Sequence, residues 1–120
     1  MKARTVSTHR GGMFSWLFQR ITAILLIVCL AIHLSLTHLA NIGKVDSANV
    51  AARLAHHGLT AVDIILLAAG LFHALNGLRM VLMDYWFSSR TRALVLTGVL
   101  WVVGLAFLGY GIWALWPWIG

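Results

Sequence analysis

The stretch ITAILLIVCLAIHLSLTHL, residues 21–39, decides the fold of this chain. It is apolar apart from two threonines, one serine and two histidines, and it contains no Asp, Glu, Lys or Arg. A helix rises ~1.5 Å per residue, so a run of this length is about long enough to cross the ~30 Å of hydrocarbon in a bilayer. The stretch therefore predicts a membrane-spanning helix.

Two further apolar runs have the same character, at residues 59–83 and 93–116. Of the 120 residues, 61% are hydrophobic and 10% are charged, and the mean hydropathy is +0.89. A soluble domain this short would not be so apolar. The sequence predicts an all-α integral membrane protein of one domain, residues 1–120, without a separate soluble catalytic unit. Its three transmembrane helices are expected at about 14–40, 58–84 and 91–117.

The basic residues predict the topology. Most of them precede the first run or flank the connection between the second and third: Lys2, Arg4, Arg10, Arg20, Arg79, Arg90 and Arg92. The connection between the first and second runs has only Lys44 and Arg53. The positive-inside rule predicts that the N-terminus lies on the cytoplasmic side of a bacterial inner (cytoplasmic) membrane. The formal charge of +6 is explained by this bias and by binding to acidic lipid or an acidic partner. The sequence contains no nucleic-acid motif.

The third run predicts a scaffold. Thr97, Gly104 and Gly111 recur every seven residues, which places small residues along one stripe of a helix. Such a stripe is typical of close helix packing in membranes.

Two histidines inside the predicted spans are the candidates for chemistry. Ionisable groups within a membrane are costly and usually functional, although His33 or His73 could also simply hydrogen-bond a neighbouring helix. At ~100° per residue, Gly70, Gly77 and Asp84 fall on nearly the same face as His73. The two glycines would leave a flat recess beside the imidazole, as a porphyrin edge requires. Neutral imidazole groups on facing helices are the usual ligands of haem iron in a membrane bundle. His73 is a stronger candidate for such a ligand than His33.

The end of the second span is unusually polar. Arg79 lies six residues from His73, ~9 Å along a helix, and could pair with a haem propionate, snorkel to the headgroups, or do both. Tyr85 could be an aromatic-belt residue, and Asp84 could simply pair with Arg79 or Arg90. A phenol beside a carboxylate would also suit a quinone head group, which needs a hydrogen-bond donor and a route for protons.

The start of the first span carries a second polar group, expected at the same depth as Asp84: Ser15, Gln19, Arg20 and Thr22. Arg20 could be a positive-inside anchor or a cation near the quinone pocket. The polar side chains of the outer half are interpreted as interfacial: His38 (a reserve ligand), His56, His57, and Asp63, which could pair with Arg53 or cap its helix.

Two motifs together are typical of one family. FQRIT, residues 18–22, opens the first span, and His33 follows its Arg by thirteen residues; HALNGLRMVLMDY, residues 73–85, closes the second span. In this second motif, His-x-x-x-Gly is followed by Asp-Tyr, and it is the specific part. The chain resembles the small membrane-anchor subunits of succinate dehydrogenase (succinate:quinone oxidoreductase, complex II), most closely the D-type hydrophobic subunit, over all three spans.

The resemblance implies that His73 is an axial ligand of haem b, and that Asp84 and Tyr85 line the quinone pocket beside an iron–sulfur subunit. Two-haem members carry a further ligand in the first span, where this chain has His33, so one or two haems are expected. No second histidine lies at the depth of either, so each iron would take its other ligand from a second hydrophobic anchor subunit.

The implied function is that of an anchor in the electron-transport enzyme of the tricarboxylic acid cycle, passing electrons from the iron–sulfur subunit to quinone. The expected partners are the flavoprotein subunit, the iron–sulfur subunit, the sister anchor, quinone and the lipid membrane. The chain has neither a dinucleotide fingerprint nor cysteine clusters, so no catalytic residue for succinate is expected in it.

Three rival interpretations remain at the level of sequence. The same anchor could serve a menaquinol:fumarate reductase, since nothing in the sequence fixes the direction of electron flow. It could be a haem-free structural anchor or a small regulatory membrane protein, with His33 and His73 joining helices by hydrogen bonds. A channel or carrier is disfavoured, because the polar residues cluster at one face and one surface.

Overall fold

The structure is a computed structural model, which describes residues 10–39, 46–85 and 89–119. Every regular element in these ranges is helical. They are α1 (Arg10–Leu34), a π-helical turn (Ser35–Leu39), α2 (Ser47–Leu54), α3 (His57–Tyr85), α4 (Arg90–Leu115) and a 3₁₀ turn (Trp116–Trp118). Lys2, Arg4 and Lys44, on which part of the predicted topology rests, lie outside the described residues.

Three helical segments are long and apolar enough to cross a membrane: Gly12–Leu39, His57–Tyr85 and Arg90–Trp118. The prediction of an all-α chain with three transmembrane helices is confirmed. The first helix begins at Arg10, four residues before the predicted start. Gly11 and Gly12 do not prevent this, because a glycine weakens a helix by only about 1 kcal/mol.

Side-chain caps begin α2 and α4. Asp46 accepts a hydrogen bond from the backbone N–H of Asn49 at 2.8 Å, and Ser89 accepts one from the N–H of Arg92 at 3.3 Å. Each cap satisfies one of the N–H groups that a helix start leaves without a partner. The cap at Asp46 also sets the start of the short outer helix, Ser47–Leu54.

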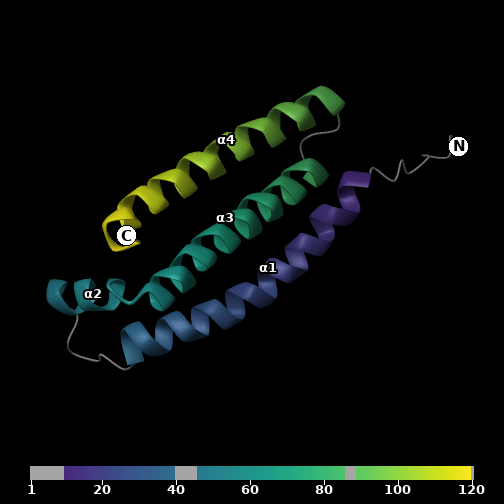
Figure 1. Cartoon of the computed structure of the whole chain (residues 1–120). Coiled ribbons are helices and arrows are strands. Elements are labelled where there is room, and N and C mark those ends of the chain that lie inside the picture. Colours follow the sequence, from purple (N-terminus) through teal and green to yellow (C-terminus); the bar gives the residue numbers. More distant parts are fainter. Residues whose placement is uncertain (1–9, 40–45, 86–88, 120) are drawn as a thin grey trace, which may run out of the picture.

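The three long helices form a single layer, with α3 between α1 and α4 (Figure 1). The start of α1 lies at the same end of the layer as the end of α3 and the start of α4. The α2 helix and the end of α4 lie at the opposite end (Figure 1). The two ends of the described chain therefore emerge on opposite sides of a membrane.

Small residues allow α4 to approach α3 closely. A Cβ atom added to Gly104 would lie 2.7 Å from Leu75 Cδ1, and one added to Gly111 would collide with Leu67. The predicted packing stripe of α4 is thus confirmed. A layer encloses little core, however, and among the described residues only Thr22, Cys29, Thr60 and Ala69 are buried.

Candidate functional site

His73 lies at the contact between α1 and α3, where Thr22 fixes its ring. The imidazole Nδ1 is 3.2 Å from Thr22 Oγ1. The Thr22 hydroxyl also lies 2.7 Å from the carbonyl oxygen of Phe18, one turn earlier in α1. A hydroxyl has a single hydrogen, which the shorter contact assigns to Phe18, so the Thr22 oxygen accepts from Nδ1–H. This tautomer leaves the lone pair of His73 on Nε2.

That second nitrogen is reachable from the surface. Nε2 of His73 has no hydrogen-bond partner among the described residues. Within the same ranges, no unpartnered nitrogen or oxygen of a side chain is sealed from the surface. His73 is therefore arranged like many metal-binding histidines, with one nitrogen held by a hydrogen bond and the other available.

The predicted recess beside His73 is filled by α1. A Cβ atom on Gly77 would lie 3.2 Å from Gln19 Nε2, and one on Gly70 would lie 3.7 Å from Leu26 Cδ2. Gln19 Nε2 also donates to the carbonyl oxygen of His73 at 3.0 Å. The expectation of an open slot within this chain is wrong, because Gln19 and Leu26 of α1 lie over the two glycines. At Gly77 the approach is tight, whereas at Gly70 it is an ordinary van der Waals contact.

His33 belongs to a cluster around Asp63 near the opposite end of the layer. Its Nδ1 is 2.8 Å from Asp63 Oδ1, and Asp63 Oδ2 is 2.7 Å from a terminal nitrogen of Arg53. The cluster links α1, α2 and α3. The pairing of Asp63 with Arg53 was expected from the sequence, whereas the contact with His33 was not. Nε2 of His33 has no hydrogen-bond partner among the described residues.

A second imidazole lies near His33. The ring centroids of His33 and His38 are 6.2 Å apart, across the start of the π-helical turn Ser35–Leu39. His38, the reserve ligand named from the sequence, is thus a neighbour of His33. π-Helical turns are rare and often occur at functional sites.

The two candidate ligands lie at different depths. His33 contacts Asp63, which precedes His73 by ten residues in the same helix, or ~15 Å along the axis. His73 is closer to the end of the layer where α1 starts.

An uncharged network joins the polar residues of α1 to α3. Ser15 donates to Asn76 Oδ1 at 2.6 Å, and Asn76 Nδ2 donates to Gln19 Oε1 at 2.7 Å. Ser15 and Gln19 were expected in one polar group, whereas Asn76 was not expected as their partner. A lone amide inside an apolar span was the signal, because it needs partners on a neighbouring helix.

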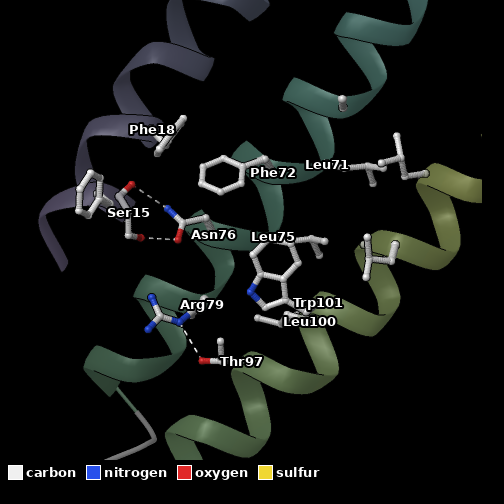
Figure 2. Close-up of a pocket in the computed structure, with 15 residues that line it drawn as sticks. Ser15, Phe18, Leu71, Phe72, Leu75, Asn76, Arg79, Thr97, Leu100 and Trp101 are labelled. Atoms are coloured by element: carbon white, nitrogen blue, oxygen red, sulfur yellow. Dashed lines mark hydrogen bonds between the residues drawn. The ribbon is translucent and has the colours of Figure 1, made fainter. Parts of the chain in front are cut away.

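Arg79 lies on a different face of α3 from His73. Its Nε donates to Thr97 Oγ1 of α4 at 2.9 Å, whereas His73 contacts α1. Six helical positions correspond to a rotation of ~120° from His73, which agrees with these partners. Figure 2 shows the hydrogen bond from Arg79 to Thr97 of α4.

The three residues predicted to surround quinone are not all together. Asp84 and Tyr85 end α3, and Tyr85 is 82% exposed. Asp84 makes no ion pair within the described ranges, so the alternative pairing with Arg79 or Arg90 is not found there. Arg20 instead stacks over the ring of Trp16, 4.3 Å from its centroid.

Arg20 lies at the depth of His73. It stands between Gln19 and Thr22, which both bond to His73, and Asp84 is eleven residues further along α3, ~16 Å. The shared depth expected for Arg20 and Asp84 is wrong, because α1 continues three turns before Arg20 instead of starting near it. Its guanidinium leans back over Trp16 towards the helix start, as a snorkelling arginine does.

The chain is similar in sequence to known small membrane subunits. Residues 2–115 match the succinate dehydrogenase/fumarate reductase transmembrane subunit family. The chain is 35% identical over 101 residues to a succinate dehydrogenase hydrophobic membrane anchor subunit of Archaeoglobus fulgidus, covering 84% of this chain and 86% of the relative. It is 31% identical over 106 residues to succinate dehydrogenase 2 membrane subunit SdhC of Mycobacterium tuberculosis, covering 88% and 75%.

A similarly named anchor subunit of Rickettsia bellii is 29% identical over 100 residues, covering 82% of this chain and 78% of the relative. No solved structure matches the chain. The chain belongs to the succinate dehydrogenase/fumarate reductase transmembrane subunit family, as a membrane anchor subunit of succinate dehydrogenase. It is thus a multi-pass membrane protein and a non-catalytic part of an oxidoreductase complex.

Proposed function

We propose that this anchor holds haem b on His73, completes a quinone site at Asp84 and Tyr85, and carries electrons from an iron–sulfur subunit to quinone. The observation that carries the proposal is the Thr22–His73 contact, which leaves the Nε2 lone pair for iron. Hydrogen-bonding the distant nitrogen of a ligating imidazole is the usual way to fix its tautomer and orientation.

The donor set fits a haem iron at His73 and a second one at His33. In both residues Nδ1 is held, by a hydroxyl at His73 and by a carboxylate at His33. A haem bound there supplies one-electron transfer, with a potential that depends on its axial ligands and their partners. Because α1 lies over Gly70 and Gly77, a haem held by His73 would also need residues of the sister anchor subunit to complete its site.

The quinone site is placed at the end of α3. The Tyr85 phenol donates a hydrogen bond to a quinone carbonyl, and the Asp84 carboxylate takes protons from water and delivers them to the reduced ring. Both side chains are exposed, which leaves them available to quinone and to a partner subunit. Arg20, at the depth of His73, contributes positive potential to the approach from within the membrane.

The partners and orientation follow from the same proposal. The flavoprotein and iron–sulfur subunits dock at the end of the layer where Arg90 and Arg92 lie, which is the cytoplasmic side of the inner membrane by the positive-inside rule. The N-terminus is cytoplasmic. Succinate oxidation takes place on those partner subunits.

The Tyr85→Phe variant removes one hydroxyl and keeps the ring. Because the lost hydrogen bond strengthens as charge develops on the quinone oxygen, we expect a loss of roughly 1–3 kcal/mol, or about a tenfold or larger drop in quinone-dependent turnover. Steady-state assays of succinate oxidation with quinone, and with an artificial acceptor that bypasses quinone, measure the effect. The second activity should be unchanged.

The Tyr110→Phe variant is the matched control, since Tyr110 is also an exposed tyrosine but lies on α4. It should alter neither activity. An equal loss of both activities in Tyr85→Phe would assign Tyr85 to structure, and no loss would leave it an interfacial residue only.

The Thr22→Val variant tests how His73 is held. Valine keeps the branched shape but cannot accept from Nδ1–H, so the tautomer of His73 is no longer fixed. We expect haem affinity at this site to fall about tenfold, as is usual for partners of metal ligands, and the electron paramagnetic resonance signal of the oxidised haem to shift. Thr22→Ser should restore both.

The Thr37→Val variant is the control for Thr22. Thr37 donates to the backbone carbonyl of His33 at 2.5 Å and bonds no imidazole nitrogen. It should leave the haem signals unchanged. If Thr22→Val also leaves them unchanged while His73 is still required for haem, then Thr22 does not position the ligand.

A further inference from the structure

A cavity of about 580 Å³ opens on one face of the layer, between α1, α3 and α4. Its walls are mainly aromatic and aliphatic, and Figure 2 shows Phe18, Phe72, Leu71, Leu75, Leu100 and Trp101 among them. No histidine lines it. The candidate haem ligands and the residues at the end of α3 are therefore separate from this space.

The cavity is polar at one end only. Arg79 and Thr97 lie at the end towards the start of α4, and Ser15 and Asn76 lie beside them (Figure 2). Ser15 and Asn76 are bonded to each other, so Arg79 is the polar group that can still bind a ligand. Its Nε is bonded to Thr97, whereas its two terminal nitrogens have no hydrogen-bond partner within the described residues.

Arg79 is also without an acidic partner in the part of the chain that the structure describes. The Arg53–Asp63 ion pair and the His33–Asp63 contact lie near the opposite end of α3. A guanidinium at the edge of the hydrocarbon is costly unless an anion or water compensates it. The two free NH2 groups of one planar fork match the oxygens of a phosphate.

The dimensions of the cavity match one leaflet of a bilayer. Along α3 it extends from Ala68 to Arg79, about 16 Å of helix and half of the ~30 Å hydrocarbon thickness. A lipid that places its headgroup at Arg79 would run its acyl chain past Phe72 towards the middle of the membrane. The polar and apolar parts of the cavity thus follow each other in the same order as the headgroup and the acyl chain of a lipid.

We propose that this cavity binds an anionic phospholipid of the leaflet at the Arg79 end, with the phosphate on the terminal nitrogens of Arg79. The acyl chain lies along the aromatic wall of Phe18, Phe72 and Trp101. The site is distinct from the haem and quinone sites and does not depend on either. The positive-inside rule makes this the cytoplasmic leaflet.

The test uses the purified complex in nanodiscs of phosphatidylglycerol or phosphatidylcholine, with retained lipid counted by native mass spectrometry after transfer to detergent. The unaltered complex should retain phosphatidylglycerol in preference to phosphatidylcholine. Arg79→Gln should reduce this retention about tenfold, the value of one charge-assisted hydrogen bond. Ala68→Phe, which fills the end of the cavity opposite Arg79 and keeps the charge, should reduce retention of either lipid.

The Arg92→Gln variant is the matched control. Arg92 is an exposed arginine in the first turn of α4 and does not line the cavity. An equal loss in Arg92→Gln, no preference between the two lipids, or unchanged retention in both cavity variants would overturn the proposal. Retention of quinone instead of phospholipid would also overturn it. A shifted haem spectrum in Arg79→Gln with intact lipid retention would assign Arg79 to a propionate.

Discussion

The His73→Ala variant is expected to lose one haem b per complex. Methyl cannot ligate iron, and the sister subunit would hold the group by a single axial bond. Because α1 and α3 also meet through Gln19 and the Ser15–Asn76 network, the chain should still insert and assemble. Haem content per complex, measured from the reduced minus oxidised absorption spectrum, is the readout.

Two further variants make this result specific. His57→Ala removes an exposed imidazole at the first residue of α3 and should leave the haem content unchanged. His73→Met offers a thioether ligand and should keep the haem but raise its reduction potential. Full haem content in His73→Ala would contradict the proposed ligation and leave His73 as a hydrogen-bonding residue between helices.

The Asp63→Asn variant is expected to destabilise the chain by about 1–3 kcal/mol. The part-buried carboxylate holds His33 with one oxygen and Arg53 with the other, so the amide leaves Arg53 without its counterion. The contacts among α1, α2 and α3 weaken together. A fall in the thermal midpoint of the purified complex, followed by loss of helical circular dichroism, measures the change.

The control for Asp63→Asn is the same substitution at Asp46. Asp46 caps α2 through Asn49, and asparagine caps a helix about as well as aspartate does. Asp46→Asn should therefore leave the thermal midpoint in place. If Asp63→Asn has the same thermal midpoint as Asp46→Asn, then the cluster at Asp63 contributes nothing measurable to stability. If His33 holds a second haem, Asp63→Asn should also raise its potential, because the imidazole loses an anionic partner.

The spans and the α4 packing stripe could be predicted because each depends on a property of one helix. Length and apolarity identified the three helices, with ends that differ from the structure by at most a few residues. Thr97, Gly104 and Gly111 recur at a helical period, which predicts a contact face whatever packs against it. The structure shows α3 there, with Leu75 and Leu67 at the two glycines.

The candidate site could be predicted less well, because it depends on register between helices. Gly70 and Gly77 predicted space beside His73, but only the position of α1 shows that Leu26 and Gln19 fill it. Arg20 was expected at the depth of Asp84, since a basic residue usually marks the end of a span. The Thr22–His73 contact instead places it deeper. To predict the His33–Asp63–Arg53 cluster, the relative positions of α1, α2 and α3 would have been needed together.

The single-layer arrangement also bears on how long a newly made copy survives in the cell. Because four of the described residues are buried, most of the chain's surface is available to contact either lipid or a neighbouring subunit. A copy without its partner subunits leaves this surface accessible to membrane proteases. Surplus copies should then be cleared quickly, so that the amount of this subunit follows the supply of its partners and not the rate of its own synthesis.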